Sequence, residues 1–148
     1  MAAREAEPWA SATLERFAKA GYRRGGAREE LVRLMDAQTC ALSAIELERA
    51  LAKSERRVSR ASIYRILEEL SELGAVQRVE IGAGEARYEA VRHGHGHHHH
   101  LVCDDCGQLR PFRDEGLERA IKRAAERVAI EVSEHEVVLR GTCPACRS

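Results

Sequence analysis

The sequence has no long apolar run, few aromatic residues and no net charge. No stretch approaches the roughly 18 apolar residues that a helix needs to cross a bilayer. The first eight residues, MAAREAEP, contain acidic residues and no apolar core, which argues against a signal peptide. We therefore expect a cytoplasmic protein with no membrane partner, in which thiols stay reduced and paired cysteines indicate a metal more readily than a disulfide.

The 24 basic and 24 acidic residues cancel, and a neutral chain by itself argues against a nucleic-acid partner. The charges are unevenly spread, however. Residues 20–65 hold ten Arg and Lys against six Asp and Glu, whereas residues 81–148 hold ten against eleven. The neutral total is therefore compatible with a basic surface on the first half. Only 4% of the residues are aromatic and 32% are charged, a composition that suits helices with charged surfaces.

The first half has the apolar spacing of short helices. Ser43 and Glu46 form a capping-box signature at the start of one helix. Ser59 is a candidate N-cap for the next, which is expected to stop at Gly74. The segments predicted to be helical are residues 9–19, 27–36, 43–51 and 59–73.

Beyond Gly74 the period changes. Alternating residues on both sides of a Gly82-Ala83-Gly84 turn predict a β-hairpin at residues 76–81 and 86–90. Helices followed by a hairpin are the order of a winged helix-turn-helix. The second half predicts a separate α/β module, with strands near residues 101–102, 109–112 and 136–141 and a helix from residue 115 to about 128. We place the first domain at residues 1–88, a hinge at residues 89–96 and the second domain at residues 97–148.

Four of the five cysteines form two C-x-x-C pairs, Cys103 with Cys106 and Cys143 with Cys146. Four thiolates suit a closed tetrahedral zinc site, because Zn(II) prefers soft sulfur ligands. The 36 residues between the pairs exceed a zinc-ribbon spacing, so the fold must bring the pairs together. The alternatives are a redox C-x-x-C motif and unrelated buried cysteines.

Six of the seven histidines lie between residues 93 and 100, just before the first cysteine pair. In an extended segment side chains alternate, so His97 and His99 share one face and His98 and His100 the other. One run can then supply two metal sites, since neutral imidazole binds Zn, Fe(II), Ni and Mn. The alternatives are a purification tag, which is normally terminal, and a solvated histidine-rich loop. The loop suits the histidines set among glycines, His93 and His95.

Several motifs occur together in this chain. SIYRILEELSELGAV lies in the predicted winged helix and ARYEA ends its hairpin, and HHHHLVCDDCG, a helix and HEVVLRGTCPAC follow. This combination, over about residues 14–146, resembles the ferric uptake regulator family of bacterial metal-dependent repressors. The resemblance implies an α+β fold, in which an N-terminal winged helix-turn-helix precedes a small α/β dimerisation domain with a four-cysteine zinc site.

The resemblance also implies metal ligands that no local pattern indicates. The two cysteine pairs match the structural zinc site of the family. A second site, between strands, takes two histidines of the run together with a helix glutamate and a histidine before the last strand. The residues that match this second site are His97, His99, Glu118 and His135.

A third implied site is the regulatory site at the domain hinge, and it is incomplete here. Glu89, His98 and His100 match its ligands. The family often adds a histidine before the third helix, where this chain has Cys40 instead. Either Cys40 substitutes for it, or a histidine of the longer loop does, or Cys40 is a small buried apolar residue. Glu89 disfavours the peroxide-sensing branch of the family, whose members tend to carry Asp there.

For DNA, the resemblance makes residues 59–73 the recognition helix, whose N-terminal part reaches the major groove in such motifs. Tyr64 is similar to a family residue that packs against thymine methyl groups, and Arg65 to a phosphate contact. The remaining residues implied in DNA binding are Ser62 near the start of the helix and two that match backbone-gripping positions, Arg23 and Arg28. Arg56 and Arg57 fit a solvated surface better.

The resemblance therefore implies a homodimeric repressor of metal homeostasis genes that binds operator DNA and has neither catalytic activity nor a small-molecule substrate. Its corepressor is expected to be Fe(II) or Zn, ahead of Mn and Ni. A metal-buffering protein or metallochaperone is the alternative, although it leaves the winged helix unexplained. A zinc hydrolase would need an open coordination position and a pocket, and the sequence defines neither.

Overall fold

The computed structural model describes residues 8–82, 84–92 and 97–147. The chain divides into two compact units, Met1–His95 and Gly96–Ser148. The strand that contains Glu89 continues to Ala90, past the domain boundary that the sequence suggested at residue 88. Within the described ranges, no helix is long and apolar enough to cross a membrane.

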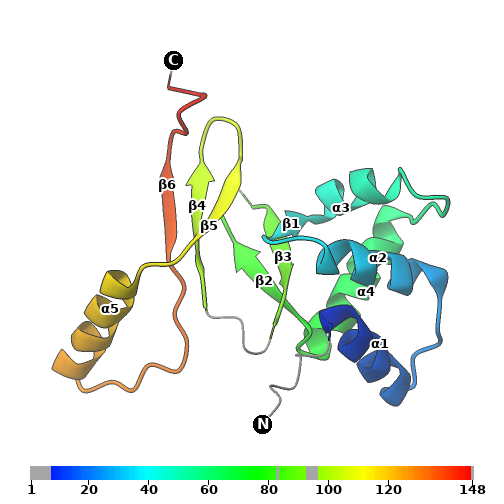
Figure 1. Cartoon of the computed structure of the whole chain (residues 1–148), viewed down its shortest axis with the longest axis horizontal. Coiled ribbons are helices and arrows are strands. Elements are labelled where there is room, and N and C mark those ends of the chain that lie inside the picture. The colour runs from blue at the N-terminus through cyan, green and yellow to red at the C-terminus, as the bar shows by residue number, and fades with distance from the viewer. Residues whose placement is uncertain (1–7, 83, 93–96, 148) are drawn as a thin grey trace, which may run out of the picture. The chain divides into compact units, whose positions relative to one another are not determined.

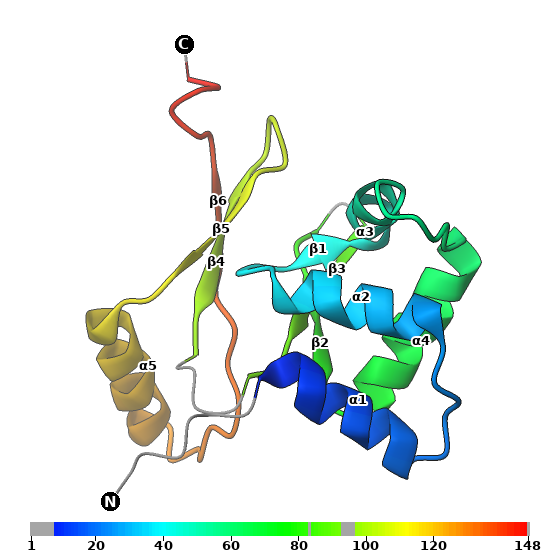
Figure 2. The ribbon, with the colours of Figure 1, turned by 45° about the vertical axis from the view of Figure 1, so that its right-hand side comes forward.

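Four helices gather beside a small sheet in the first unit (Figures 1 and 2). Ser43 accepts a hydrogen bond from the Glu46 amide, and the Glu46 carboxylate accepts one from the Ser43 amide, which confirms the predicted capping box. Ser59 caps the last helix, which ends before Gly74 in the left-handed region at φ 65°. The four helices are α1 (Trp9–Lys19), α2 (Gly26–Asp36), α3 (Ala44–Leu51) and α4 (Arg60–Glu72).

The sheet of the first unit contains the predicted hairpin and one further strand. β2 (Val76–Glu80) and β3 (Ala86–Ala90) form the hairpin, and β1 (Leu42–Ser43) pairs with the other edge of β3. All pairs are antiparallel, and Leu42 lies opposite Tyr88. The sequence did not predict β1, because a strand of two residues has no period of its own and is defined by its pairing.

The core of the first unit fixes which face of α4 is exposed. Ile63, Ile66, Leu67 and Leu70 of α4 are buried, at the spacing of one helix face. They pack with buried residues of the other helices, among them Leu31 and Leu47. Tyr64 and Arg65 therefore lie on the exposed face of the same helix.

The second unit is a three-stranded sheet with one helix (Figure 1). The strand order is β5-β4-β6, in which β5 runs antiparallel and β6 parallel to β4. A parallel pair needs a long crossover, and the helix lies within it. Asp114 caps this helix by accepting a hydrogen bond from the Leu117 amide at 2.7 Å. The elements are β4 (His99–Cys103), β5 (Leu109–Phe112), α5 (Glu115–Arg127) and β6 (Val138–Gly141).

Candidate metal centres and nucleic-acid interface

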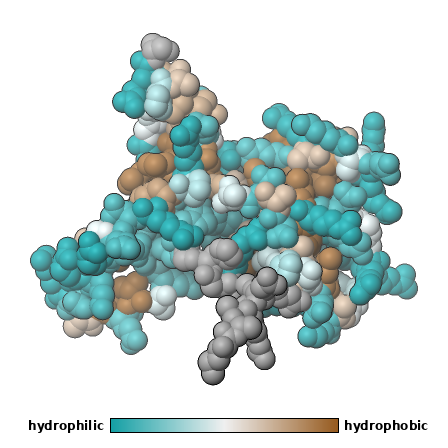
Figure 3. Space-filling model, viewed as in Figure 1, coloured by the Kyte–Doolittle hydropathy of each residue, from teal (hydrophilic) through white to brown (hydrophobic). Residues whose placement is uncertain are grey.

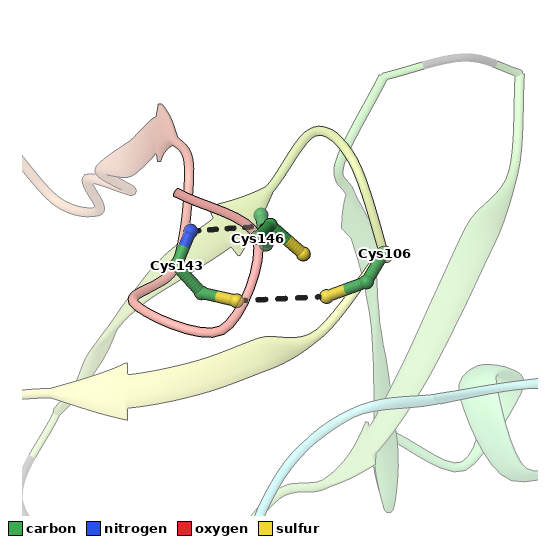
Figure 4. A group of neighbouring side chains, drawn as sticks. Cys106, Cys143 and Cys146 are labelled. Carbon is green, nitrogen blue, oxygen red and sulfur yellow. Dashed lines mark hydrogen bonds between the residues drawn. The ribbon is translucent and has the colours of Figure 1, made fainter. Parts of the chain in front are cut away.

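The parallel pairing of β4 with β6 brings the two C-x-x-C pairs together. Cys103 ends β4, and its backbone lies opposite Gly141 at the end of β6, so the following turns are neighbours. The four sulfur atoms of Cys103, Cys106, Cys143 and Cys146 lie within 4.8 Å of one another. Figure 4 shows the Cys106, Cys143 and Cys146 side chains pointing toward a common centre.

Each C-x-x-C pair is held by its turn. The Gly107 amide donates to the Cys103 carbonyl at 2.9 Å, and Gly107 adopts the left-handed φ of 72° that this turn requires. The Cys146 amide donates to the Cys143 carbonyl, also at 2.9 Å. Across the pairs, the Sγ atoms of Cys106 and Cys143 are 3.9 Å apart (Figure 4). The Cys143 amide donates to the Cys103 sulfur at 3.3 Å.

The electrostatics of the cluster favour a bound cation. The backbone amides of Cys143 and Cys106 lower the pKa of Cys103 to about 6, because they donate to its thiolate. The neighbouring sulfur atoms of Cys143 and Cys106 raise the pKa of Cys146 to about 12. The thiols therefore do not all ionise without a positive charge between them. A zinc ion supplies that charge, and four thiolates are the donor set that it prefers.

A second cluster joins His97, His99, Glu118 and His135, whose ligand atoms lie within 4.8 Å of one another. The Glu118 carboxylate lies between two imidazoles, with Oε1 2.6 Å from the Nε2 of His99 and Oε2 2.9 Å from the Nε2 of His135. The ring of His97 is 4.4 Å from that of His99 and 4.5 Å from that of His135, measured between centroids. His99 is fully buried. The fold thus assembles these residues from β4, α5 and the segments before β4 and β6.

The protonation states of this second cluster at neutral pH favour the binding of a cation. The hydrogen bond with His99 lowers the pKa of Glu118, so the carboxylate stays charged. Burial lowers the pKa of His97, and His99 and His135 lower it further, so the imidazole stays neutral. A neutral imidazole and a charged carboxylate are the forms that ligate divalent metals.

The residues that the resemblance assigned to the hinge site fall in both units. In the first, Cys40 precedes β1 and Glu89 lies in β3, and the β1–β3 pairing places their ligand atoms within 4.8 Å. Gln77 of β2 donates a hydrogen bond to Glu89. In the second unit, the His98 and His100 rings are 5.0 Å apart, and His100 is buried. His93 and His95 lie outside the described residues.

The candidate DNA-contacting residues of α4 lie at its start and on its exposed face. Tyr64 is 50% exposed, and Arg65 is exposed beside it. The Ser62 hydroxyl accepts a hydrogen bond from Ser59 at 2.9 Å, so it belongs to the N-terminal cap of α4. Arg23 is exposed in the loop between α1 and α2.

The Arg28 guanidinium is bound within the protein. Its Nε and Nη2 each donate to a Glu69 carboxylate oxygen at 2.8 Å, and its Nη1 donates to the Arg23 carbonyl at 3.2 Å. Three of its nitrogen atoms therefore donate hydrogen bonds to α4 and to the loop between α1 and α2. The sequence alone does not indicate this role for Glu69, because no local pattern links two residues 41 positions apart.

The family model that matches this chain is that of the ferric uptake regulator family, over residues 19–140. A ferric uptake regulation protein from Legionella pneumophila is 36% identical over 106 residues, which are 72% of this chain and 76% of that protein. The solved structure of the Vibrio cholerae ferric uptake regulator has a TM-score of 0.78 at 28% identity, and the match covers 87% of this chain and 98% of that one. A ferric uptake regulator from Pseudomonas aeruginosa, solved with manganese, has a TM-score of 0.70 at 26% identity, with coverage of 89% and 98%.

Proposed function

The chain belongs to the ferric uptake regulator family, and on that premise we propose that it is a homodimeric repressor whose affinity for operator DNA rises when a regulatory divalent metal binds. Members of this family are metal-dependent transcriptional regulators and not enzymes, and this chain is such a regulator. Beyond family membership, we propose that metal binding raises the affinity for DNA, that named residues hold each metal, and that the protein is a dimer.

One combination of features carries the proposal. The first unit exposes Tyr64 and Arg65 on one face of α4, and the second unit holds two clusters of metal ligands. In winged helix-turn-helix proteins the N-terminal part of this helix enters the major groove, while arginines bind backbone phosphates. A metal-buffering protein would have no use for such a helix.

The four cysteines are proposed to hold zinc permanently. A tetrahedral site of four thiolates has no open position, so the ion contributes folding free energy and takes no part in sensing. The cluster of His97, His99, Glu118 and His135 is proposed as a second site, with harder donors that suit several divalent metals. Because all its ligands belong to the second unit, we expect it to affect stability and metal loading more than the response of DNA binding to metal.

The regulatory site is proposed at Glu89, His98 and His100, with Cys40 as a candidate fourth ligand. Support comes from the family resemblance and from the proximity of Cys40 to Glu89 within the first unit. A metal held by residues of both units favours one arrangement of the units, and operator DNA that fits this arrangement binds more tightly. A Cys40 thiolate would favour Zn, whereas donors restricted to nitrogen and oxygen leave Fe(II), Mn and Ni as candidates.

The homodimer is proposed to form through the second unit. Three alternate apolar residues just after the end of α5 are exposed in the single chain: Val128, Ile130 and Val132. Figure 3 shows apolar surface, in brown, among the hydrophilic residues of this unit. Ile130 and Val132 line a groove of about 510 Å³ together with Ile121 and Ala125 of α5, and charged residues such as Lys122 and Glu126 also line it. Apolar surface of this kind on a soluble chain is typical of a protein interface.

A DNA-binding measurement tests the proposed function. Duplexes selected from a random pool by the metal-loaded protein are compared with a scrambled duplex, each with and without added Fe(II), Zn, Mn or Ni. We expect at least one metal to raise affinity for the selected duplex well above that for the scrambled one. A metal-buffering protein would bind metal without any gain in sequence-specific affinity, and this result would overturn the proposal.

A further inference from the structure

Arg28 forms a two-point ion pair within the DNA-binding unit. Its guanidinium lies at the start of α2, and Glu69, which receives both 2.8 Å hydrogen bonds, lies in the last turn of α4. The side chains are 22% and 13% exposed. Paired hydrogen bonds of this kind between a guanidinium and a carboxylate are short, strong and directional. They therefore fix α4 to the start of α2.

Two aromatic rings hold the same guanidinium in place. Its central carbon lies 5.7 Å from the ring centroid of Phe17 and 5.3 Å from that of Tyr22. The two rings pack edge to face, with centroids 5.3 Å apart. A cation over aromatic faces is attracted to them. The hydrogen bonds from Arg28 to Glu69 also raise the pKa of Arg28, because they favour the charged form.

The third contact of Arg28 reaches the loop between α1 and α2. Nη1 donates to the Arg23 carbonyl at 3.2 Å. The exposed Arg23 side chain is thus attached to a backbone that Arg28 holds. One guanidinium consequently joins the end of α1, the loop that carries Arg23 and the helix that carries Tyr64.

We propose that Arg28 is a positioning residue for DNA binding: it fixes the Arg23 loop relative to α4 and does not itself contact a phosphate. The inference rests on the proposed DNA binding of the first unit. DNA contacts made from the loop and from α4 keep one spacing only if the two segments keep their relative positions. Loss of the link lets each segment move separately, so the same contacts still form on DNA but at a higher cost in conformational entropy.

The two roles of Arg28 differ most clearly in the effect of its partner. Glu69→Gln is nearly isosteric and removes a negative charge. If Arg28 positions the loop and α4, this change weakens the pair and lowers affinity for the selected duplex, by about tenfold for the loss of one charge-assisted hydrogen bond. If Arg28 binds a phosphate, the same change frees the guanidinium and raises affinity.

The salt dependence of binding separates the roles a second time. Each lost phosphate contact lowers the slope of log affinity against log salt by about 0.9. We expect Arg28→Gln to lower affinity without changing the slope. We expect Arg23→Gln to lower the slope by about 0.9, the loss of one phosphate contact. Arg28→Lys keeps the charge but not the two-point geometry, so we expect it to behave like Arg28→Gln. Arg33→Gln, in the same helix with a 70% exposed side chain, is the matched control and is expected to change little.

The experiment uses the full-length, metal-loaded protein, and thermal unfolding is recorded for every variant. The double variant, Arg28→Gln with Glu69→Gln, should lose no more affinity than either single change, because both remove one link. The positioning role is overturned if Glu69→Gln binds more tightly than the wild type, or if Arg28→Gln lowers the salt slope as Arg23→Gln does. A wild type that binds no duplex specifically overturns the proposed function and this inference together.

Discussion

At the scale of single residues, metal binding by the cluster of His97, His99, Glu118 and His135 depends on which of its groups carry protons. Glu118 lies between His99 and His135, and its pKa is lowered mainly by the hydrogen bond with His99. The pKa of His97 is lowered mainly by burial. A group whose pKa is lower in the folded state contributes stability above its unfolded pKa and loses it as the pH falls through its folded pKa. Protonation of either group in acid therefore destabilises this cluster.

The pH dependence of metal retention follows from these directions. The free-histidine pKa is about 6.5, and the folded value for His97 lies below the ordinary value. We expect metal at this site to be kept at neutral pH and released as the pH falls below the free-histidine range. Dialysis against a weak chelator over a pH series, with metal content measured at each step, checks this. Metal retention that is independent of pH down to the carboxylate range would contradict the ligand set.

At the scale of elements, the four-cysteine cluster connects the ends of β4 and β6, two strands that pair only through a long crossover. We expect Cys103→Ser or Cys146→Ser to unfold the second unit or to make it monomeric. The physical reason is that binding of structural zinc contributes on the order of 10 kcal/mol to folding. Zinc content, sedimentation and thermal unfolding check the prediction.

Cys40→Ser is the matched control for the zinc site. Cys40 belongs to the first unit and lies outside the four-cysteine cluster, so the control should keep its zinc and its oligomeric state. A Cys103→Ser protein that keeps full thermal stability without zinc would falsify the structural role.

A second element-scale link holds the C-terminal end of α2. Arg92 donates from Nη1 to an Asp36 side-chain oxygen and from Nη2 to the Asp36 carbonyl, each at 2.7 Å. Its guanidinium also lies 5.7 Å from the ring centroid of Trp9 in α1. A cation at a helix C-terminus satisfies free carbonyls and interacts favourably with the helix dipole.

We expect Arg92→Gln to lower the free energy of unfolding of the first unit by about 1–2 kcal/mol, since it removes charge-assisted hydrogen bonds that are mostly shielded from solvent. Chemical denaturation followed by the Trp9 fluorescence measures this. Arg78→Gln is the control, because the Arg78 and Glu80 side chains are 58% and 62% exposed and such pairs contribute little. Equal losses in the two variants would show that the Arg92 link has no special role.

How far the sequence predicted these elements depends on how local their causes are. The helices were predicted well because their signals are local, such as the capping box of Ser43 and Glu46 and the stop at Gly74. β1 was missed because only its pairing with β3 defines it. The pair of Arg28 and Glu69 was missed for the same reason, since two residues on different helices meet only after folding. The convergence of the two cysteine pairs required the β4–β6 pairing, although the ligand types were clear from the spacing.

At the scale of the whole molecule, the total charge is neutral, but the two units differ in their charge and in the metal ligands that they carry. The basic excess lies in residues 20–65, where the proposed DNA contacts occur. The second unit instead carries two clusters of four metal ligands each. In our proposal the response of DNA binding to metal depends on residues contributed by both units, namely Glu89, His98 and His100, with Cys40 as the candidate fourth ligand.

The most direct test of this account is the affinity for the selected duplex as a function of free metal, measured for the wild type and for two double variants. His98→Ala with His100→Ala should abolish the gain in affinity on metal addition, while zinc content and the dimer remain. His97→Ala with His99→Ala should lower stability or metal loading and cause only a graded loss of affinity. If the two double variants prove indistinguishable in metal stoichiometry and in DNA affinity, the histidine run is a single chelating loop and the account of separate structural and regulatory sites is wrong.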